Sequence, residues 1–368
     1  MKIALVHDYL VQYGGAERVL ECFCELYPYA PIYTIVYNKD LMHGALEGKD
    51  IRTSYLQKIP FVSTHHRIFP PLMPMAIEQF SFNQFDIILS DSSSFAKGII
   101  TSPDTLHICY MHTPMRYAWD DCQKYTEEFY FPRFIKRIVP FLMNRIRVWD
   151  RVSADRPDFI IANSGFIKKR IKKYYKRDSS IIYPPVNFEN FYISETIGDY
   201  FLLVGRFMRY KRFDLVISAF NELKMPLKII GRGPEMEDFK KNASSNIEFL
   251  GRVSDEELAR YYSECKAFIF PQEEDFGITA IEAMASGRPI IAYRGGDIPE
   301  HMEEGKTGIL FDTQSSQDLI KAIRSFDEND YNPTYIREKA KKFDKKLFKD
   351  KIKAYIEDKY AKFKADKS

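Results

Sequence analysis

The sequence predicts an α/β protein built from two doubly wound domains, and three observations support this prediction. Short runs rich in Val, Ile, Leu and Phe alternate with amphipathic segments along the chain, which is the pattern of βαβ units around a parallel sheet. The alternation occurs in two series, which are separated by a segment with two consecutive prolines. At 368 residues the chain is also longer than a single hydrophobic core usually becomes.

The first series of strand-like runs predicts an N-terminal domain over residues 1–187. It begins with KIALVHDY, which a helix over 16–26 follows, and continues through PIYTIVY, DIILSDS, HICYMH and DFIIANS. Pro184 and Pro185 in SIIYPPVNF prevent helix and favour an extended chain. We therefore place the domain junction near residue 187.

The second series predicts a C-terminal domain over residues 188–345 and a final helix over 346–368. Its strand-like runs are YFLLVGRF, LKIIGRG, IEFLGRV, AFIFPQ and PIIAYRGG. In the charged C-terminal segment, aromatic and aliphatic residues recur at helical spacing. This spacing favours an amphipathic helix packed on a core over an arm that binds nucleic acid.

Composition and cysteine usage exclude several classes of protein. With 54 basic and 51 acidic side chains the net charge is +3, and we find no concentrated basic face of the kind that binds nucleic acid. The N-terminus does not resemble a signal peptide, and the longest apolar stretches fall short of the roughly 20 apolar residues that a membrane span needs. The cysteines are odd in number and lack CxxC spacing, which favours reduced thiols in a cytoplasmic protein and argues against a metal site or disulfides. They are Cys22, Cys24, Cys109, Cys122 and Cys265.

The sharpest motif is EDFGITAIEAMASGRPIIA, in which Glu274 and Glu282 are separated by seven residues. Gly277 allows a sharp turn, and a helix is expected to begin at Ile278. The first amides of a helix lack partners within it, so they form an anion site that suits a diphosphate. The two carboxylates could then bracket a nucleotide sugar, one at the hexose hydroxyls and one at the ribose. Taken alone, a Glu pair at this spacing is more typical of two solvated surface acids.

A second motif, VGRFMRYKRF, places Arg206 and Lys211 after a predicted strand. Two fixed cations can neutralise the charge of a leaving diphosphate without a metal ion. The alternative is a basic surface loop.

Together these motifs resemble those of glycosyltransferase family 4, and the resemblance extends over nearly the whole chain. It implies the GT-B fold, with two Rossmann-like domains facing a cleft and a C-terminal helix that crosses back to the N-terminal domain. It also implies a retaining, metal-independent glycosyltransferase whose nucleotide diphosphate sugar is a substrate, with no cofactor. In the family, the arginine and lysine of GR-x4-K contact the pyrophosphate, and Arg206 and Lys211 match them.

Two N-terminal motifs complete the resemblance. His112 in YMHTPMRYAWD follows a strand, and in open α/β sheets such residues lie at the ligand-binding edge. A lone histidine is usually structural, but the family aims one at the transferred sugar from this segment. Gly14 and Gly15 in QYGGAERVL open a helix after the first strand, where family members carry a glycine turn that faces the donor phosphate. The turn lacks the GxGxxG pattern of dinucleotide oxidoreductases.

The resemblance assigns further loops to the nucleotide, with the backbone around Arg252 and Val253 holding the base. The expected catalytic residues are Arg206, Lys211, Glu274 and His112. The expected donor-binding residues are Gly14, Gly15, Gly231, Gly251, Arg252, Val253, Phe276, Gly277, Ile278, Thr279 and Glu282.

The motifs look closest to bacterial mannosyltransferases of O-antigen assembly. This implies transfer of mannose from GDP-mannose to a saccharide or lipid-linked acceptor in polysaccharide synthesis. Ala280 and Asn187 stand where relatives often have proline and aspartate, which weakens the donor assignment but not the enzyme class. The alternatives are a UDP-sugar donor, a GT-B epimerase or phosphorylase, and a binding module without activity. Linkage, acceptor and oligomeric state are not encoded in any recognisable motif.

The segment over 131–151, FPRFIKRIVPFLMNRIRVWDR, is both basic and apolar. Such a pattern is usually a core helix with a solvated basic face. If the acceptor is lipid-linked, the same segment would lie at the inner face of the cell membrane. Phe134, Ile138 and Phe141 would then dip into the membrane. The basic residues of the segment include Arg133, Lys136, Arg137, Arg145 and Arg147.

Overall fold

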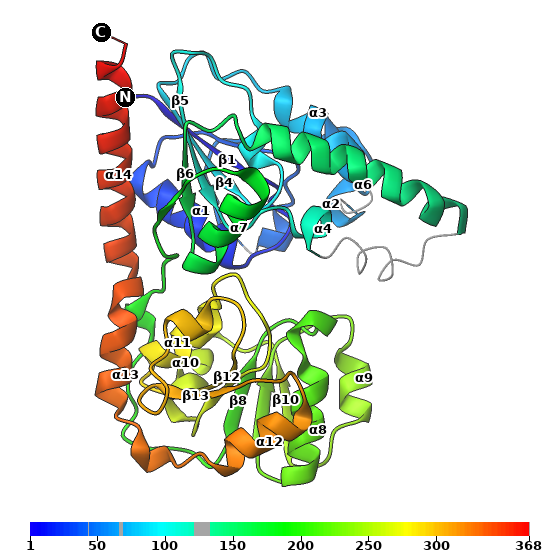
Figure 1. The fold of residues 1–368 in the computed structure, drawn as a ribbon, viewed down its shortest axis with the longest axis vertical. Helices are drawn as coiled ribbons and strands as arrows, with labels where there is room; N and C mark the ends of the chain where they lie inside the picture. The colour runs from blue at the N-terminus through cyan, green and yellow to red at the C-terminus, as the bar shows by residue number, and fades with distance from the viewer. Residues whose placement is uncertain (43, 66–68, 121–132, 368) are drawn as a thin grey trace. The chain divides into compact units, whose positions relative to one another are not determined.

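The computed structural model describes residues 1–42, 44–65, 69–120 and 133–367 (Figure 1). The described chain divides into two compact units. Unit 1 comprises residues 1–185 and 348–368, and unit 2 comprises residues 186–347. The expected junction near residue 187 lies next to this boundary.

Within the described residues, unit 1 contains a seven-stranded sheet in the order β3-β2-β1-β4-β5-β6-β7. All of its neighbouring strands pair in parallel. The order reverses between β1 and β4, which defines a doubly wound sheet whose ligands bind at the carboxyl ends of the strands near the reversal. The strands are β1 (Ile3–His7), β2 (Ile32–Thr34), β3 (Ile51–Thr53), β4 (Ile87–Ser92), β5 (Leu106–Met111), β6 (Phe159–Ala162) and β7 (Ser180–Ile181).

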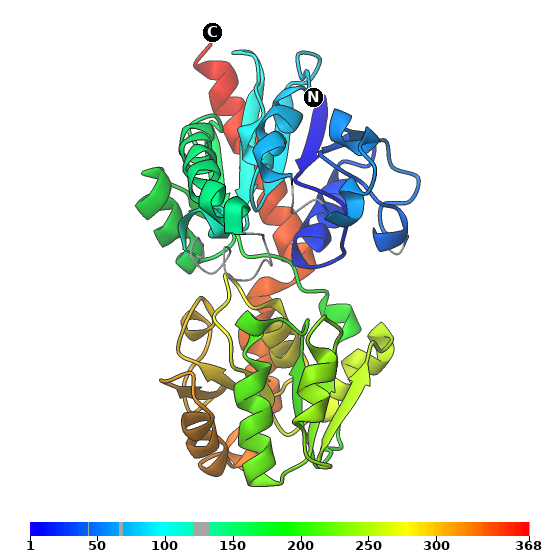
Figure 2. The ribbon, with the colours of Figure 1, turned by 90° about the vertical axis from the view of Figure 1, so that its right-hand side faces the viewer.

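Helices cover both faces of this sheet (Figure 2). In β1, Leu5 packs with the helices on one face, while Ala4 and Val6 pack with those on the other. Burial on both faces explains why the strands are continuous apolar runs. One face carries α1 (Gly15–Leu26) and α14 (Lys345–Ala365), and the other carries α2 (Val62–His65), α3 (Met73–Glu78), α4 (Arg116–Trp119), α6 (Arg133–Ser153) and α7 (Gly165–Tyr175). Short 3-10 helices are η1 (Asp40–Met42), η2 (Tyr55–Lys58), η4 (Pro70–Leu72) and η5 (Ala96–Gly98).

The C-terminal helix α14 belongs to unit 1 from Phe348 onward. Phe348 stacks on Phe23 of α1 at 6.0 Å between ring centroids, and Ile352 and Ile356 are fully buried in the same core. The expected return of the C-terminal helix to the N-terminal unit is confirmed.

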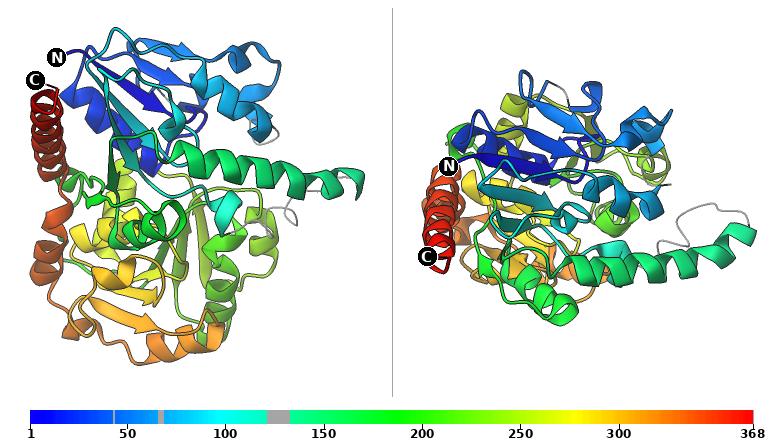
Figure 3. Two further views of the ribbon diagram at one scale, coloured as in Figure 1. Left: turned by 45° about the horizontal axis from the view of Figure 1, so that its top comes forward. Right: turned by 90° about the horizontal axis from the view of Figure 1, so that it is seen from above.

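Helix α6 is long, and its N-terminal half extends beyond the sheet of its own unit (Figure 3). Pro140 lies inside it. The C-terminal half packs on the sheet through Met143 and Ile146, which are buried.

Unit 2 contains a six-stranded parallel sheet in the order β10-β9-β8-β11-β12-β13. Its order reverses between β8 and β11, so this unit is doubly wound as well and the predicted fold is confirmed. The strands are β8 (Phe201–Val204), β9 (Leu227–Ile230), β10 (Ile247–Gly251), β11 (Phe268–Phe270), β12 (Ile290–Tyr293) and β13 (Gly308–Phe311).

The helices of unit 2 also cover both faces of their sheet. One face carries α8 (Phe213–Leu223), α9 (Met236–Lys241) and α12 (Ser316–Arg324), and the other carries α10 (Asp255–Glu264), α11 (Ile278–Ala285) and α13 (Pro333–Ala340). The 3-10 helices of this unit are η6 (Phe188–Asn190), η7 (Arg209–Lys211), η8 (Ile298–Glu300), η9 (Glu328–Asp330) and η10 (Lys341–Phe343).

Candidate active site

The central feature of unit 2 is an ion pair between Lys211 and Glu274. Lys211 ends η7, which follows β8, and Glu274 follows the neighbouring strand β11. The Lys211 Nζ donates a hydrogen bond to Glu274 Oε1, and the two side chains are only 14% and 19% exposed. Burial alone lowers the pKa of Lys211, but the carboxylate of Glu274 outweighs this effect and raises it. Lys211 is therefore a fixed cation, as the sequence predicts for a diphosphate site.

The backbone around Glu274 is held in place from two sides. The Asp297 amide donates to the Glu274 carbonyl at 3.1 Å, and Phe276 packs edge-on against Phe343 at 5.3 Å between ring centroids. Gly277 has φ of +81°, and a Cβ there would lie 2.7 Å from Ile298 Cγ1, so a side chain is excluded. Helix α11 begins at Ile278, the residue expected from the sequence. Its first amides are oriented for an anion.

Glu282 lies inside α11 with an exposure of only 2%. The Tyr262 hydroxyl of α10 donates to its Oε2 at 3.1 Å. The sequence predicts Glu282 as a donor-binding residue but gives no sign of Tyr262, because this contact joins two different helices and leaves no local pattern.

The loops that follow β8, β9 and β10 meet at the same edge of the sheet. Gly231 has φ of +146°, and a Cβ there would lie 1.8 Å from the Gly205 carbonyl oxygen. Its amide donates to the Gly251 carbonyl at 2.8 Å. Arg206 and Arg252, which follow Gly205 and Gly251, are exposed. Unit 2 thus gathers the expected donor-binding loops at the carboxyl ends of its strands.

In unit 1, His112 takes part in a line of side chains at the order reversal of the sheet. His112 Nε2 lies 2.5 Å from Asp91 Oδ1, and Asp91 Oδ2 lies 2.9 Å from His7 Nδ1. His7 Nε2 is 3.7 Å from Glu17 Oε1. The other oxygen of Glu17 accepts a hydrogen bond from the Gly14 amide at 2.8 Å. Gly14 and His112, which the sequence predicts as ligand-facing, are therefore connected through three side chains that it did not reveal.

The charges of this line are set by mutual pairing in a buried environment. Burial alone lowers the pKa of His7, but hydrogen bonding to Asp91 and Glu17 raises it to about 10. Burial alone raises the pKa of Asp91, but His112 and His7 lower it overall. At neutral pH a cationic His7 therefore lies between two carboxylates.

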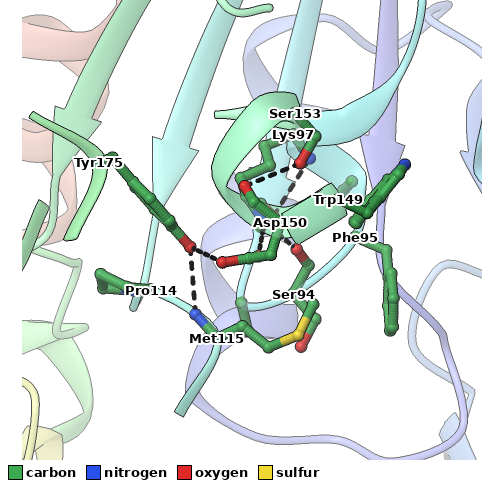
Figure 4. A network of polar contacts seen from close by, with 12 residues as sticks. Ser94, Phe95, Lys97, Pro114, Met115, Trp149, Asp150, Ser153 and Tyr175 are labelled. Carbon is green, nitrogen blue, oxygen red and sulfur yellow. Dashed lines mark hydrogen bonds and ion pairs between the residues drawn. The ribbon is translucent and has the colours of Figure 1, made fainter. Parts of the chain in front are cut away.

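A second buried network contacts the loop that follows His112 through the Met115 amide (Figure 4). Lys97 Nζ lies 2.5 Å from Asp150 Oδ1, and Lys97 also donates to the Ser94 carbonyl. The Tyr175 hydroxyl donates to Asp150 Oδ2 at 2.7 Å and accepts from the Met115 amide at 3.3 Å. The network thus links η5, α6 and α7 to the loop that carries His112.

Some sequence-based expectations fall outside the described structure. Residues 131–132 and Cys122 lie outside the described residues, as do the side chains of Arg133, Phe134, Lys136, Arg137 and Ile138. The other four cysteines are buried thiols. Over the described parts of the chain, no group of three or more His, Cys, Asp or Glu side chains could hold a metal ion. In the same parts, every helix is too short or too polar to cross a membrane.

Comparisons with known proteins agree with this architecture. Residues 192–343 match the family model for glycosyl transferases group 1. The uncharacterized glycosyltransferase MJ1178 of Methanocaldococcus jannaschii is 32% identical over 55% of this chain and 58% of its own length. The O-antigen chain mannosyltransferase C of Escherichia coli is 25% identical over 59% of this chain and 61% of its own length. The chain thus spans about three fifths of the length of these two relatives.

A solved structure extends the likeness to the whole fold. Anabaena HepE, crystallised in complex with UDP, matches 97% of this chain and 100% of its own with a TM-score of 0.72 at 16% identity. The chain is therefore a protein of the GT-B glycosyltransferase fold that resembles bacterial O-antigen mannosyltransferases.

Proposed function

We propose that the protein is a retaining glycosyltransferase that moves a hexose from a nucleotide diphosphate sugar to a saccharide or lipid-linked acceptor. The observation that carries the proposal is the Lys211–Glu274 pair beside the N-terminus of α11. A cation and oriented amides suit a diphosphate, and a carboxylate suits the hydroxyls of a hexose.

In this proposal the diphosphate replaces Glu274 as the partner of Lys211. Arg206 and the first amides of α11 share the charge that develops as the sugar leaves, so no metal ion or cofactor is required. Glu274 then accepts hydrogen bonds from the hexose, and Glu282 serves the ribose. The leaving diphosphate takes the acceptor proton on the same face of the sugar, which retains the anomeric configuration. We assign His112, in unit 1, the role of a sugar-positioning residue.

The proposed donor is GDP-mannose. Similarity to the O-antigen mannosyltransferase C supports this choice. The alternative is a UDP-sugar, which the UDP bound to HepE favours. The base-contacting positions act through their backbone, so their side chains do not decide between the two.

A donor screen tests the proposal. We expect GDP-mannose to raise the melting temperature of the native protein more than UDP-glucose or UDP-GlcNAc, and Lys211→Ala to remove the shift. Product formed with a polysaccharide or lipid-linked acceptor fraction should show the α-anomer of mannose by NMR. Stabilisation by UDP-sugars alone would reassign the donor. No stabilisation by any nucleotide sugar would reject the enzyme class.

We further propose that α6 contacts the inner face of the cell membrane. Phe141, Val148 and Val152 are 61%, 59% and 58% exposed, and their spacing of seven and four residues places them on one side of the helix. The Arg145 guanidinium lies over the Phe141 ring, 5.1 Å from its centroid. Apolar side chains beside cations suit a surface of anionic headgroups.

A further inference from the structure

The line from Glu17 to His112 joins four elements that are distant in sequence. Its members come from α1, β1, β4 and the residue after β5. The side chains of Glu17 and His7 are 4% exposed and that of Asp91 is fully buried, whereas that of His112 is 12% exposed. One end of the line therefore reaches the surface at His112. The other end reaches the backbone of the glycine turn at Gly14.

Burial of this many ionisable groups has a free-energy cost that only pairing offsets. Both ring nitrogens of His7 face carboxylates, since Nδ1 lies against Asp91 and Nε2 faces Glu17. A doubly protonated His7 therefore offsets one of the two negative charges. Asp91 stays ionised, and an ionised carboxylate can only accept hydrogen bonds.

The ionised carboxylate of Asp91 determines which ring nitrogen of His112 carries a proton. The Asp91 Oδ1 atom lies 2.5 Å from His112 Nε2, so Nε2 must carry a proton. In the neutral ring Nδ1 then carries the lone pair. We propose that Glu17, His7 and Asp91 are positioning residues that hold His112 as the Nε2–H tautomer, with Nδ1 presented as the hydrogen-bond acceptor for a sugar hydroxyl. The identity of the ligand, a sugar, rests on the proposed function, whereas the tautomer of His112 does not.

The same line couples the glycine turn to His112. Because the Gly14 amide is held by Glu17, a ligand that moves the turn also changes the hydrogen bond of Glu17 and, through His7 and Asp91, that of His112. We therefore expect that substitution of Glu17, which does not touch His112, changes the protonation or environment of the His112 ring nitrogens.

The chain offers a matched control in His107. This residue is also buried on β5, and its Nε2 atom lies 2.8 Å from the hydroxyl of Ser90 on β4. Burial lowers its pKa to about 3, so it is a neutral buried histidine outside the line. A His107→Gln variant therefore reports the effect of removing a buried histidine from the same part of the sheet.

The tautomers can be read from long-range proton–nitrogen NMR of the full chain labelled with 15N-histidine. His7→Gln and His112→Gln variants assign the two rings among the seven histidines. No donor is added, so this readout does not depend on the proposed function. We expect a protonated Nε2 and an unprotonated Nδ1 in His112, and a doubly protonated His7 at pH 7.5. Glu17→Gln and Asp91→Asn should shift the His112 nitrogens, whereas His107→Gln should not.

Kinetics with the accepted donor then test the consequence. We expect Asp91→Asn to lower kcat by roughly 100-fold with little change in KM, since loss of an orienting carboxylate misplaces the proton of a histidine. In the His112→Gln background the same change should have little further effect. An Nδ1–H tautomer in the native chain, or His112 signals unchanged by both Glu17→Gln and Asp91→Asn, would overturn the inference. If Asp91→Asn does not fold, the response of the His112 signals to Glu17→Gln alone decides whether the inference holds.

Discussion

Lys211 and Glu274 are 63 residues apart in sequence, yet they form an ion pair at the ends of neighbouring strands of unit 2. We expect Lys211→Ala and Glu274→Ala each to lower kcat by ~100-fold or more, because in the proposed mechanism Lys211 stabilises the charge of the leaving diphosphate and Glu274 binds the hydroxyls of the hexose. Steady-state rates with the accepted donor measure the effect.

The control for this prediction is Arg209→Ala. Arg209 lies two residues before Lys211 and carries the same charge in the same loop. Its side chain is 79% exposed and pairs with Glu235. We expect its removal to change kcat less than threefold, in line with the small contribution of exposed pairs. Turnover within fivefold of native in folded Lys211→Ala would remove Lys211 from the proposed site.

The rate should not depend on divalent metal ions. In the proposed mechanism, Lys211, Arg206 and the amides of α11 supply the positive charge that a metal would otherwise supply. We expect activity after dialysis against EDTA to equal that of the untreated enzyme, and added Mg²⁺ or Mn²⁺ to leave it unchanged. A loss that one of these ions restores would contradict metal independence.

His7 should make stability depend on pH. Its pKa rises from 6.5 to about 10 on folding, so the folded state binds more protons than the unfolded state between these values. The stabilisation is complete below pH 6.5 and is lost as pH rises through 10. We expect the difference in free energy of unfolding between native protein and His7→Gln to shrink from pH 7 to pH 10.5 in urea titrations. A difference that grows with pH would contradict a buried imidazolium.

The sequence could predict those site residues whose neighbours in the chain form a motif. Glu274 and Gly277 lie in one continuous motif, and α11 begins at the expected residue, directly after Gly277, whose φ is +81°. His7 and Asp91 were missed, because they pair across 84 residues and a parallel sheet leaves no sequence record of which strand ends become neighbours. Tyr262 was missed because its contact with Glu282 joins two helices, α10 and α11, and leaves no local pattern.

The Lys97–Asp150 pair should contribute strongly to folding. Lys97→Met leaves the carboxylate of Asp150 buried without its cation, although Tyr175 still donates to it. Loss of one partner of a buried pair typically costs about 3–5 kcal/mol. We expect a loss of this size in urea unfolding, and a smaller one in the double variant Lys97→Met with Asp150→Leu.

The surface pair of Lys349 and Glu25 provides the comparison. Their side chains are 30% and 41% exposed at a distance of 3.0 Å. Lys349→Met should therefore change the free energy of unfolding by about 1 kcal/mol or less. Equal losses for Lys97→Met and Lys349→Met would mean that the network in Figure 4 does not anchor the His112 loop.

Membrane contact through α6 should depend on its basic N-terminal half. Each cation near an anionic surface contributes about 1 kcal/mol, and exposed charges are screened by salt. We expect the native chain to sediment with anionic but not with neutral liposomes, and less so at high salt. The triple variant Arg133→Ser, Lys136→Ser and Arg137→Ser should bind at least tenfold more weakly.

A control variant separates this local effect from the change in net charge. The control variant also loses three positive charges, but from exposed positions of α14: Lys351→Ser, Lys353→Ser and Lys364→Ser. If attachment is a property of α6, this variant keeps native binding, because α14 lacks the exposed apolar row that Phe141, Val148 and Val152 form. Equal weakening in both variants would mean that only net charge matters. Equal binding to neutral and anionic liposomes would contradict contact between α6 and anionic headgroups. It would favour the interpretation of α6 as a helix with a solvated basic face and of the acceptor as a soluble saccharide.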